Sequence, residues 1–128
     1  MRILLDTCAL LALAGSAGTL SKAGSEAIGK ADPVFVSSVS IWEIAIKSAS
    51  KKLNLSLAPW DWFEAARDRY ALSELPLDGL SACSAAALPE IHRDPFDRLL
   101  VATAIRHQLT LLTSDRAIRQ YPGVQTLW

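Results

Sequence analysis

The chain has 128 residues, a formal net charge of zero, 51% hydrophobic residues and 20% charged residues. This length is enough for one domain with a hydrophobic core, and the composition excludes an intrinsically disordered chain. The two cysteines, Cys8 and Cys83, are too few and too far apart for a disulfide framework or a structural zinc site. Because the net charge is zero, any attraction for a nucleic acid has to come from a local patch.

The N-terminal stretch combines a short apolar run with an acidic residue. Ile3–Leu5 is typical of a buried parallel strand, and Asp6 ends it before a helix over Cys8–Leu13. The stretch superficially resembles a secretion signal, but Asp6 interrupts the apolar run and we reject that interpretation. We expect Cys8 to be a small buried hydrophobe, no segment to span a membrane, and a cytoplasmic location as the default.

Strands and helices are predicted to alternate along the rest of the chain. Short apolar or β-branched runs indicate strands, and serine or aspartate residues before apolar stretches supply helix N-caps. The predicted strands are 34–36, 73–75, 109–113 and, at an edge of the sheet, 124–127. The predicted helices are 21–30, 41–47, 60–70, 78–88, one that starts at 94–95, and 114–120. This alternation predicts an α/β fold in which helices cover both faces of a parallel sheet.

Asp97 heads a mostly apolar stripe on its helix. Asp94 followed by Pro95 predicts the helix start, since aspartate caps free N–H groups and proline fits the first turn. Counting helically from Asp97, positions 100, 101, 104 and 108 are Leu, Val, Ala and Gln. An acid on such a stripe has to be paired, bound to a metal or placed at the end of the helix. Taken alone, a favourable interaction with the helix dipole explains Asp97 equally well.

Four acids are predicted to gather at one edge of the sheet. In an open parallel sheet the ligand site lies beyond the carboxyl ends of the strands. Asp6 directly follows the first strand, and Asp115 lies at the carboxyl end of the strand that contains Leu111, Leu112 and Thr113. Glu43 lies early in the helix after the second strand, and Asp97 begins the helix before the fourth. Each has a structural alternative, because Asp6 or Asp115 could cap a helix and Glu43 could pair with Lys47 one turn later.

Clustered carboxylates repel one another and therefore need cations. Oxygen ligands of this kind suit Mg²⁺ or Mn²⁺, which support metal-assisted phosphodiester hydrolysis by making hydroxide from water and stabilising the leaving oxygen. Two alternatives remain open. One is a phosphatase or phosphotransferase with Asp6 as nucleophile, although Cys8 stands where enzymes of the haloacid-dehalogenase type usually have a second aspartate. The other is a non-catalytic binding module whose acids only cap helices.

Four segments carry a resemblance to a known family. They are ILLDT at 3–7, SSVSIWEIAIK at 37–47, HRDPFDRLLVA at 92–102 and LTSD at 112–115. In this order and spacing they resemble the PIN-domain ribonucleases and, within them, the VapC-type toxins of bacterial type II toxin–antitoxin pairs. The match covers nearly the whole chain. It implies a single three-layer α/β/α domain over 1–128, with a central parallel sheet of four to five strands.

The resemblance also implies a function and a set of site residues. The protein would be a Mg²⁺-dependent endoribonuclease, with Mn²⁺ as a second candidate metal, that acts on RNA, forms a homodimer and is blocked by an antitoxin tail in its acidic groove. The four acids assigned to catalysis are Asp6, Glu43, Asp97 and Asp115. Asp6 and Asp97 would be the most direct metal ligands, and the other two would complete the site directly or through water.

Further polar residues lie beside these acids in the matching segments. The resemblance places Thr7 and Thr113 near the metal or the phosphate. Arg98 is assigned to substrate phosphate, since arginine suits phosphate contacts, with a surface pairing role as the alternative. Asp94 is interpreted as the N-cap of its helix. His92 is interpreted as structural and is left out of the catalytic set.

Overall fold

The computed structural model describes residues 1–128 and contains one sheet of five parallel strands in the order β3-β2-β1-β4-β5. The strands are β1 (Ile3–Leu5), β2 (Val34–Ser37), β3 (Leu72–Leu75), β4 (Thr110–Leu112) and β5 (Gln125–Leu127). The central strand is β1, in which Leu5 pairs with Val36 on one side and Leu112 on the other. The predicted parallel α/β sheet is confirmed, with β5 at an edge as expected.

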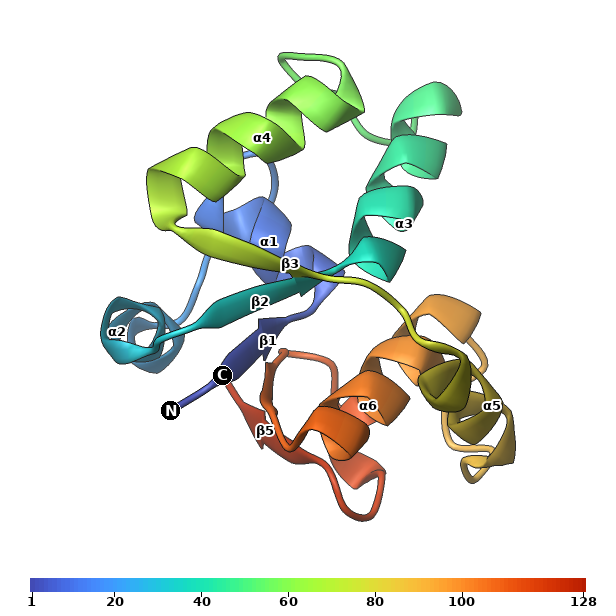
Figure 1. Ribbon diagram of the computed structural model, residues 1–128. Coiled ribbons are helices and arrows are strands. Elements are labelled where there is room, and N and C mark those ends of the chain that lie inside the picture. The colour runs from blue at the N-terminus through green and yellow to red at the C-terminus, as the bar shows by residue number, and fades with distance from the viewer.

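Helices cover both faces of this sheet (Figure 1). They are α1 (Thr7–Leu13), α2 (Lys22–Lys30), α3 (Ser38–Ala49), α4 (Pro59–Tyr70), α5 (Gly79–Ala87) and α6 (Pro95–His107). Helices α1, α2 and α4 pack on one face, and α5 and α6 lie on the other. Helix α3 leaves the carboxyl end of β2 and packs against both α4 and α6. The result is the predicted three-layer α/β/α arrangement.

The alternation of side chains along β1 divides the core into two layers. Ile3 and Leu5 belong to the cluster that contains Phe63 of α4, whereas Leu4 belongs to the cluster that contains Leu100 of α6. All three residues of β1 have 0% exposure. A strand covered on both faces has no solvent side, and this explains the continuous apolar run in its sequence.

Side-chain caps fix the starts of five helices, and those of α1, α3 and α6 lie near the predicted acids. The side chains of Asp6, Ser37 and Asp94 each accept a hydrogen bond from a backbone N–H two or three residues later. These bonds satisfy donors that the first helical turn leaves free. The predicted N-cap role of Asp94 is therefore confirmed, and Asp6 caps α1 as the structural alternative proposed.

Two local predictions are wrong. Cys8 is exposed, because the buried stripe of α1 passes through Thr7, Leu10 and Leu11 and leaves Cys8 on the opposite side. The helix predicted over 114–120 is only a 3₁₀ turn, η1 (Ile118–Gln120). The other predicted strands and helices are present with small shifts at their ends. No helix is both long and apolar enough to cross a bilayer.

Candidate active site

The four predicted acids lie at the carboxyl edge of the sheet. Asp6 follows β1, Glu43 lies in α3, Asp97 lies in the first turn of α6, and Asp115 follows β4. They are close enough for their charges to interact, since Asp115 and Glu43 both raise the pKa of Asp6. Glu43 and Asp6 likewise raise the pKa of Asp97. The convergence predicted from the strand ends is therefore present.

Asp97 carries the most perturbed carboxylate of the four. Its side chain is 18% exposed. Burial, followed by the charge of Asp94, raises its pKa from 3.8 to about 7, although the nearby His92 acts in the opposite direction. Asp94 already caps the helix, so the carboxylate of Asp97 is not needed for that purpose. Position and environment both distinguish Asp97 from an ordinary acid in a first helical turn.

Asp6 is buried and only partly compensated. Its Oδ1 accepts a hydrogen bond of 2.7 Å from the backbone N–H of Ala9. Burial raises its pKa, and the hydrogen bonds from Thr113 and Ala9 only partly oppose that effect. No lysine or arginine forms an ion pair with Asp6, Asp97 or Asp115. The edge therefore holds negative charge that the protein itself does not fully neutralise.

Glu43 is held by groups on both of its oxygens. Oε2 lies 2.6 Å from Nζ of Lys47, and Oε1 accepts a 2.7 Å hydrogen bond from Oγ1 of Thr7. The pairing with Lys47 is confirmed, but Glu43 is 7% exposed and does not lie on a solvated helix face. The hydrogen bond to Glu43 raises the pKa of Lys47. Thr7 itself is buried, so its hydroxyl fixes Glu43.

Asp115 is bound by backbone amides on one oxygen and by a histidine on the other. Oδ1 accepts from the N–H groups of Ala117 (2.8 Å) and Ile118 (3.3 Å), and Oδ2 lies 3.0 Å from Nε2 of His92. Burial alone would raise the pKa of Asp115, but these hydrogen bonds outweigh burial and lower it. Of Asp6, Asp97 and Asp115, Asp115 is thus the one that stays ionised most readily.

His92 is the residue that sequence reasoning left out. Its Nε2 lies 3.1 Å from Oδ2 of Asp97 as well as 3.0 Å from Oδ2 of Asp115, so it connects two of the four acids. Its position two residues before the cap of α6, inside the third matching segment, was the available signal. The sequence interval of 23 residues to Asp115 concealed the contact.

Arg98 and Thr113, like Thr7, were assigned to substrate and have protein partners. The guanidinium of Arg98 donates to the carbonyls of Ala85 (2.8 Å), Leu88 (3.0 Å) and Pro89 (2.9 Å), and it thereby ties α6 to the end of α5. These bonds engage both terminal nitrogens of Arg98, which corresponds to the pairing role given as the alternative. Thr113 is fully buried, and its hydroxyl accepts from the backbone N–H of Asp115.

The donor set at this edge fits a hard divalent cation. Its acids offer carboxylate oxygens, which Mg²⁺ and Mn²⁺ prefer over nitrogen and sulfur donors. One ligand atom each from His92, Asp97 and Asp115 lies within 4.8 Å of the others. A bound cation would relieve the repulsion that, together with burial, raises the pKa of Asp97 and Asp6.

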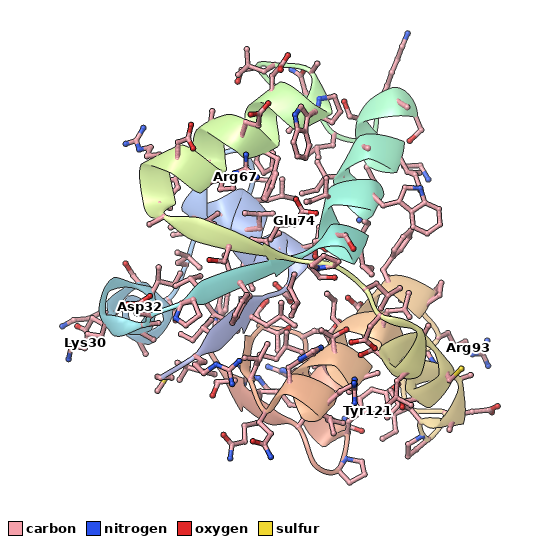
Figure 2. The ribbon with its side chains drawn as sticks, in the orientation of Figure 1. Lys30, Asp32, Arg67, Glu74, Arg93 and Tyr121 are labelled. Atoms are coloured by element: carbon pink, nitrogen blue, oxygen red, sulfur yellow. The ribbon has the colours of Figure 1, made fainter.

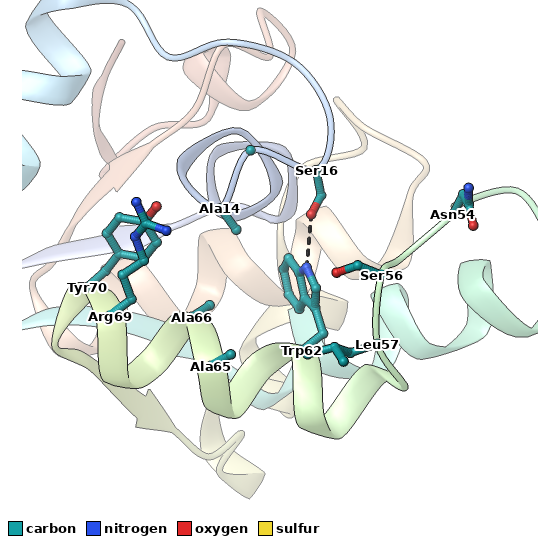
Figure 3. Close-up of a pocket in the computed structure, with 11 residues that line it drawn as sticks. Ala14, Ser16, Asn54, Ser56, Leu57, Trp62, Ala65, Ala66, Arg69 and Tyr70 are labelled. Carbon is teal, nitrogen blue, oxygen red and sulfur yellow. Dashed lines mark hydrogen bonds between the residues drawn. The ribbon is translucent and has the colours of Figure 1, made fainter.

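A separate pocket lies away from the acids (Figure 3). It has a volume of about 430 Å³ and lies between the end of α1, the segment before α4, and α4 itself. Trp62 lines it and donates from Nε1 to Oγ of Ser16 over 2.9 Å. None of the four acids lines this pocket, so we do not assign the chemistry of the acids to it.

Comparison with known proteins places the chain in a family. The sequence profile of the PIN domain matches residues 3–124, which include all four acids at the edge of this parallel α/β/α sheet. The chain therefore belongs to the PIN-domain family. It is 33% identical over 112 residues to Ribonuclease VapC22 of Mycobacterium tuberculosis, and the match covers 85% of each chain. This similarity makes it a VapC-type member, as the four segments indicated.

Solved structures share the fold. A chain of the DNA-bound VapBC complex from Salmonella typhimurium is similar with a TM-score of 0.70 and 19% identity, over 99% of this chain and 97% of that one. A chain of VapBC2 from Rickettsia felis, solved with a DNA fragment from their promoter, gives a TM-score of 0.73 and 16% identity, over 100% and 99%. At these identities the likeness supports the three-layer fold.

Proposed function

We propose that this protein is a Mg²⁺-dependent endoribonuclease, with Mn²⁺ as an alternative metal, and the toxin of a type II toxin–antitoxin pair. The observation that carries the proposal is the set of four carboxylates at one sheet edge, among which the pKa of Asp97 is raised to about 7. The similarity to Ribonuclease VapC22 supports RNA as the substrate. The similarity to VapBC complexes supports an antitoxin as the partner.

The proposal gives each acid a role. Asp6 and Asp97 would hold the metal most directly, and Glu43 and Asp115 would complete the site directly or through water. A bound ion would supply a water of lowered pKa and neutralise charge on the phosphate. The surrounding groups keep the acids in place: Thr7 and Lys47 fix Glu43, and backbone amides fix Asp115.

The two alternative functions have less support. A phosphatase would need Asp6 as a free nucleophile, yet one of its oxygens caps α1 and burial raises its pKa, so that a larger share of it is protonated. A binding module with purely capping acids would have no use for Asp97, since Asp94 supplies the cap of α6. The similarity of the chain to a ribonuclease supports the nuclease proposal and neither of these alternatives.

Cleavage of total RNA by the partner-free protein tests the proposal. Reactions with Mg²⁺ or Mn²⁺ are compared with an EDTA control and with Asp97→Asn, and the RNA ends are sequenced. Asp61→Asn is the matched control, because Asp61 occupies the same first-turn position after proline and an aromatic residue in α4 but is exposed. We expect defined cuts that require metal, persist in Asp61→Asn and disappear in Asp97→Asn. Equal cleavage by both variants would contradict the proposal.

The partner assignments have their own tests. We propose a homodimer and a small antitoxin whose tail enters the acidic groove. Light scattering of the isolated chain is expected to give twice its mass of 13.8 kDa. Addition of the antitoxin is expected to abolish both RNA cleavage and Mn²⁺ binding, since the tail and the metal would compete for the same carboxylates. An inhibited complex that still bound Mn²⁺ normally would place the antitoxin elsewhere.

A further inference from the structure

His92 stands between two acids that reach the site from different elements. It lies in the segment between α5 and α6, and its side chain is 20% exposed. Nε2 is 3.1 Å from Oδ2 of Asp97 in α6 and 3.0 Å from Oδ2 of Asp115 beyond β4. A single ring nitrogen therefore contacts both carboxylates.

The other ring nitrogen shows which atom carries the hydrogen. Nδ1 of His92 accepts a 3.1 Å hydrogen bond from the backbone N–H of Asp94. A nitrogen that accepts must have a free lone pair, so the ring hydrogen lies on Nε2. That hydrogen points toward Asp97 and Asp115, and His92 is a donor to both of them.

This arrangement is the reverse of that of a metal-binding histidine. A histidine that binds a metal through Nε2 carries its hydrogen on Nδ1 and donates it to a carboxylate, a carbonyl or water. In this protein a hydrogen on Nδ1 would face the N–H of Asp94, and two donors would meet. The proximity of Nε2 to the two carboxylates therefore reflects donation to them.

The backbone of His92 is held by Tyr121 and Arg98. Its N–H donates to Oη of Tyr121 over 2.8 Å, and its carbonyl lies 3.4 Å from the same hydroxyl and 3.5 Å from a nitrogen of Arg98. Tyr121 is 3% exposed and lies beside α6, whereas the neighbouring Arg93 extends into solvent (Figure 2). The buried tyrosine thus holds the histidine at a fixed place.

We propose that His92 is a positioning residue that holds Asp97 and Asp115 in a converging orientation for the metal and does not itself bind the metal. The inference rests on the proposed function, because it assigns the cation to the carboxylates. The shared N–H draws the two like charges together where they would otherwise repel. Residues that orient metal ligands typically change metal affinity by about 10- to 100-fold when they are removed.

Two substitutions separate the two nitrogens of the ring. His92→Asn keeps an acceptor near the position of Nδ1 but has no donor near that of Nε2, whereas His92→Gln places an amide donor near Nε2. Mn²⁺ affinity is measured by calorimetry on the partner-free chain, and thermal denaturation without metal checks folding. We expect His92→Asn to bind Mn²⁺ about 10- to 100-fold more weakly, with a thermal midpoint near that of the wild type. We expect His92→Gln to regain most of the affinity.

Electron spin-echo spectroscopy of Mn²⁺ bound to the wild type provides the second readout. We expect no coupling to a directly bound imidazole nitrogen, and such a coupling would overturn the inference. It is also overturned if His92→Asn binds Mn²⁺ as tightly as the wild type, or if His92→Gln is as weak as His92→Asn. A wild type that binds no divalent ion would instead remove the proposed function and this inference with it.

Discussion

Asp97→Asn is expected to make the metal-free protein more stable at about pH 8. Burial, and next the charge of Asp94, raise the pKa of Asp97 from 3.8 to about 7 in the folded protein, while the unfolded chain ionises near 3.8. Between these values the folded state binds more protons than the unfolded state. The free energy of unfolding of the wild type therefore falls as the pH rises from about 4 to about 7 and then stays low. Asparagine carries no charge, so the stability of Asp97→Asn does not fall with pH for this reason.

The size of the effect follows from the pKa. The difference between 3.8 and about 7 corresponds to at most about 4 kcal/mol, at about 1.4 kcal/mol for each pH unit. The side chain is 18% exposed, so solvent screens only part of this energy. The amide oxygen of asparagine can still accept a hydrogen bond from His92, but this bond is weaker than one to a carboxylate. The weaker bond reduces the gain in stability by roughly 1 kcal/mol. We expect a net gain of about 2–3 kcal/mol at about pH 8, declining toward pH 4.

Urea denaturation in EDTA, over this pH range, measures the gain. Asp61→Asn serves as the comparison, because it removes only a favourable interaction with the dipole of α4, worth about 0.3–1 kcal/mol. That variant is expected to be equally stable or slightly less stable than the wild type. Relative to the wild type, the free energy of unfolding should thus rise in Asp97→Asn and should not rise in Asp61→Asn. If Asp97→Asn were less stable than the wild type at about pH 8, the argument that burial strains this carboxylate would be refuted.

Three further predictions concern the metal, Arg98 and Asp78. Mn²⁺ at about a hundred times its Kd is expected to raise the free energy of unfolding of the wild type by about 2.7 kcal/mol and that of Asp97→Asn by much less, measured by urea denaturation. Arg98→Lys is expected to lower the free energy of unfolding by about 1–3 kcal/mol, because lysine cannot reach three carbonyls at once. The metal affinity of the folded variant is expected to stay unchanged. A loss of metal affinity without a loss of stability would contradict the structural role. The backbone hydrogen bond from Ser81, with help from His107, lowers the pKa of Asp78 from 3.8 to about 2. The ionised Asp78 therefore stabilises the folded state above pH 3.8, and this stabilisation disappears as the pH falls toward about 2. The thermal midpoints of wild type and Asp78→Asn are expected to converge over that acidic range, and a constant gap would contradict this.

The sequence predicted the sheet and the placement of the acids because both depend on local patterns. A strand that is buried on both faces must be apolar at every position, and β1 shows this directly. Parallel strands end at the same edge, so acids that closely follow β1 and β4 had to lie near each other. The side-chain cap of Asp94 and the fixed φ of Pro95 specified the start of α6 from the local sequence alone.

What the sequence did not reveal depends on contacts between distant segments. The donors of Arg98 meet carbonyls at the end of α5, an arrangement set by the packing of two helices. The contact of His92 with Asp115 exists only because the segment before α6 reaches the end of β4. Cys8 was misassigned because a single apolar-looking position does not say which side of a short helix faces the core. Local propensity holds no information about such partners.

The starts of α4 and α6 show where the chemistry of the site originates. Both helices begin with proline, an aromatic residue and aspartate, and both aspartates lie in the first turn. Asp61 is exposed, whereas Asp97 is largely buried and interacts with three other acids. Helix α6 leads into β4 beside the central strand, so its first turn lies at the carboxyl edge of the sheet. The same local sequence thus gives an ordinary helix start in one place and a candidate metal ligand in the other, and the topology of the sheet makes the difference.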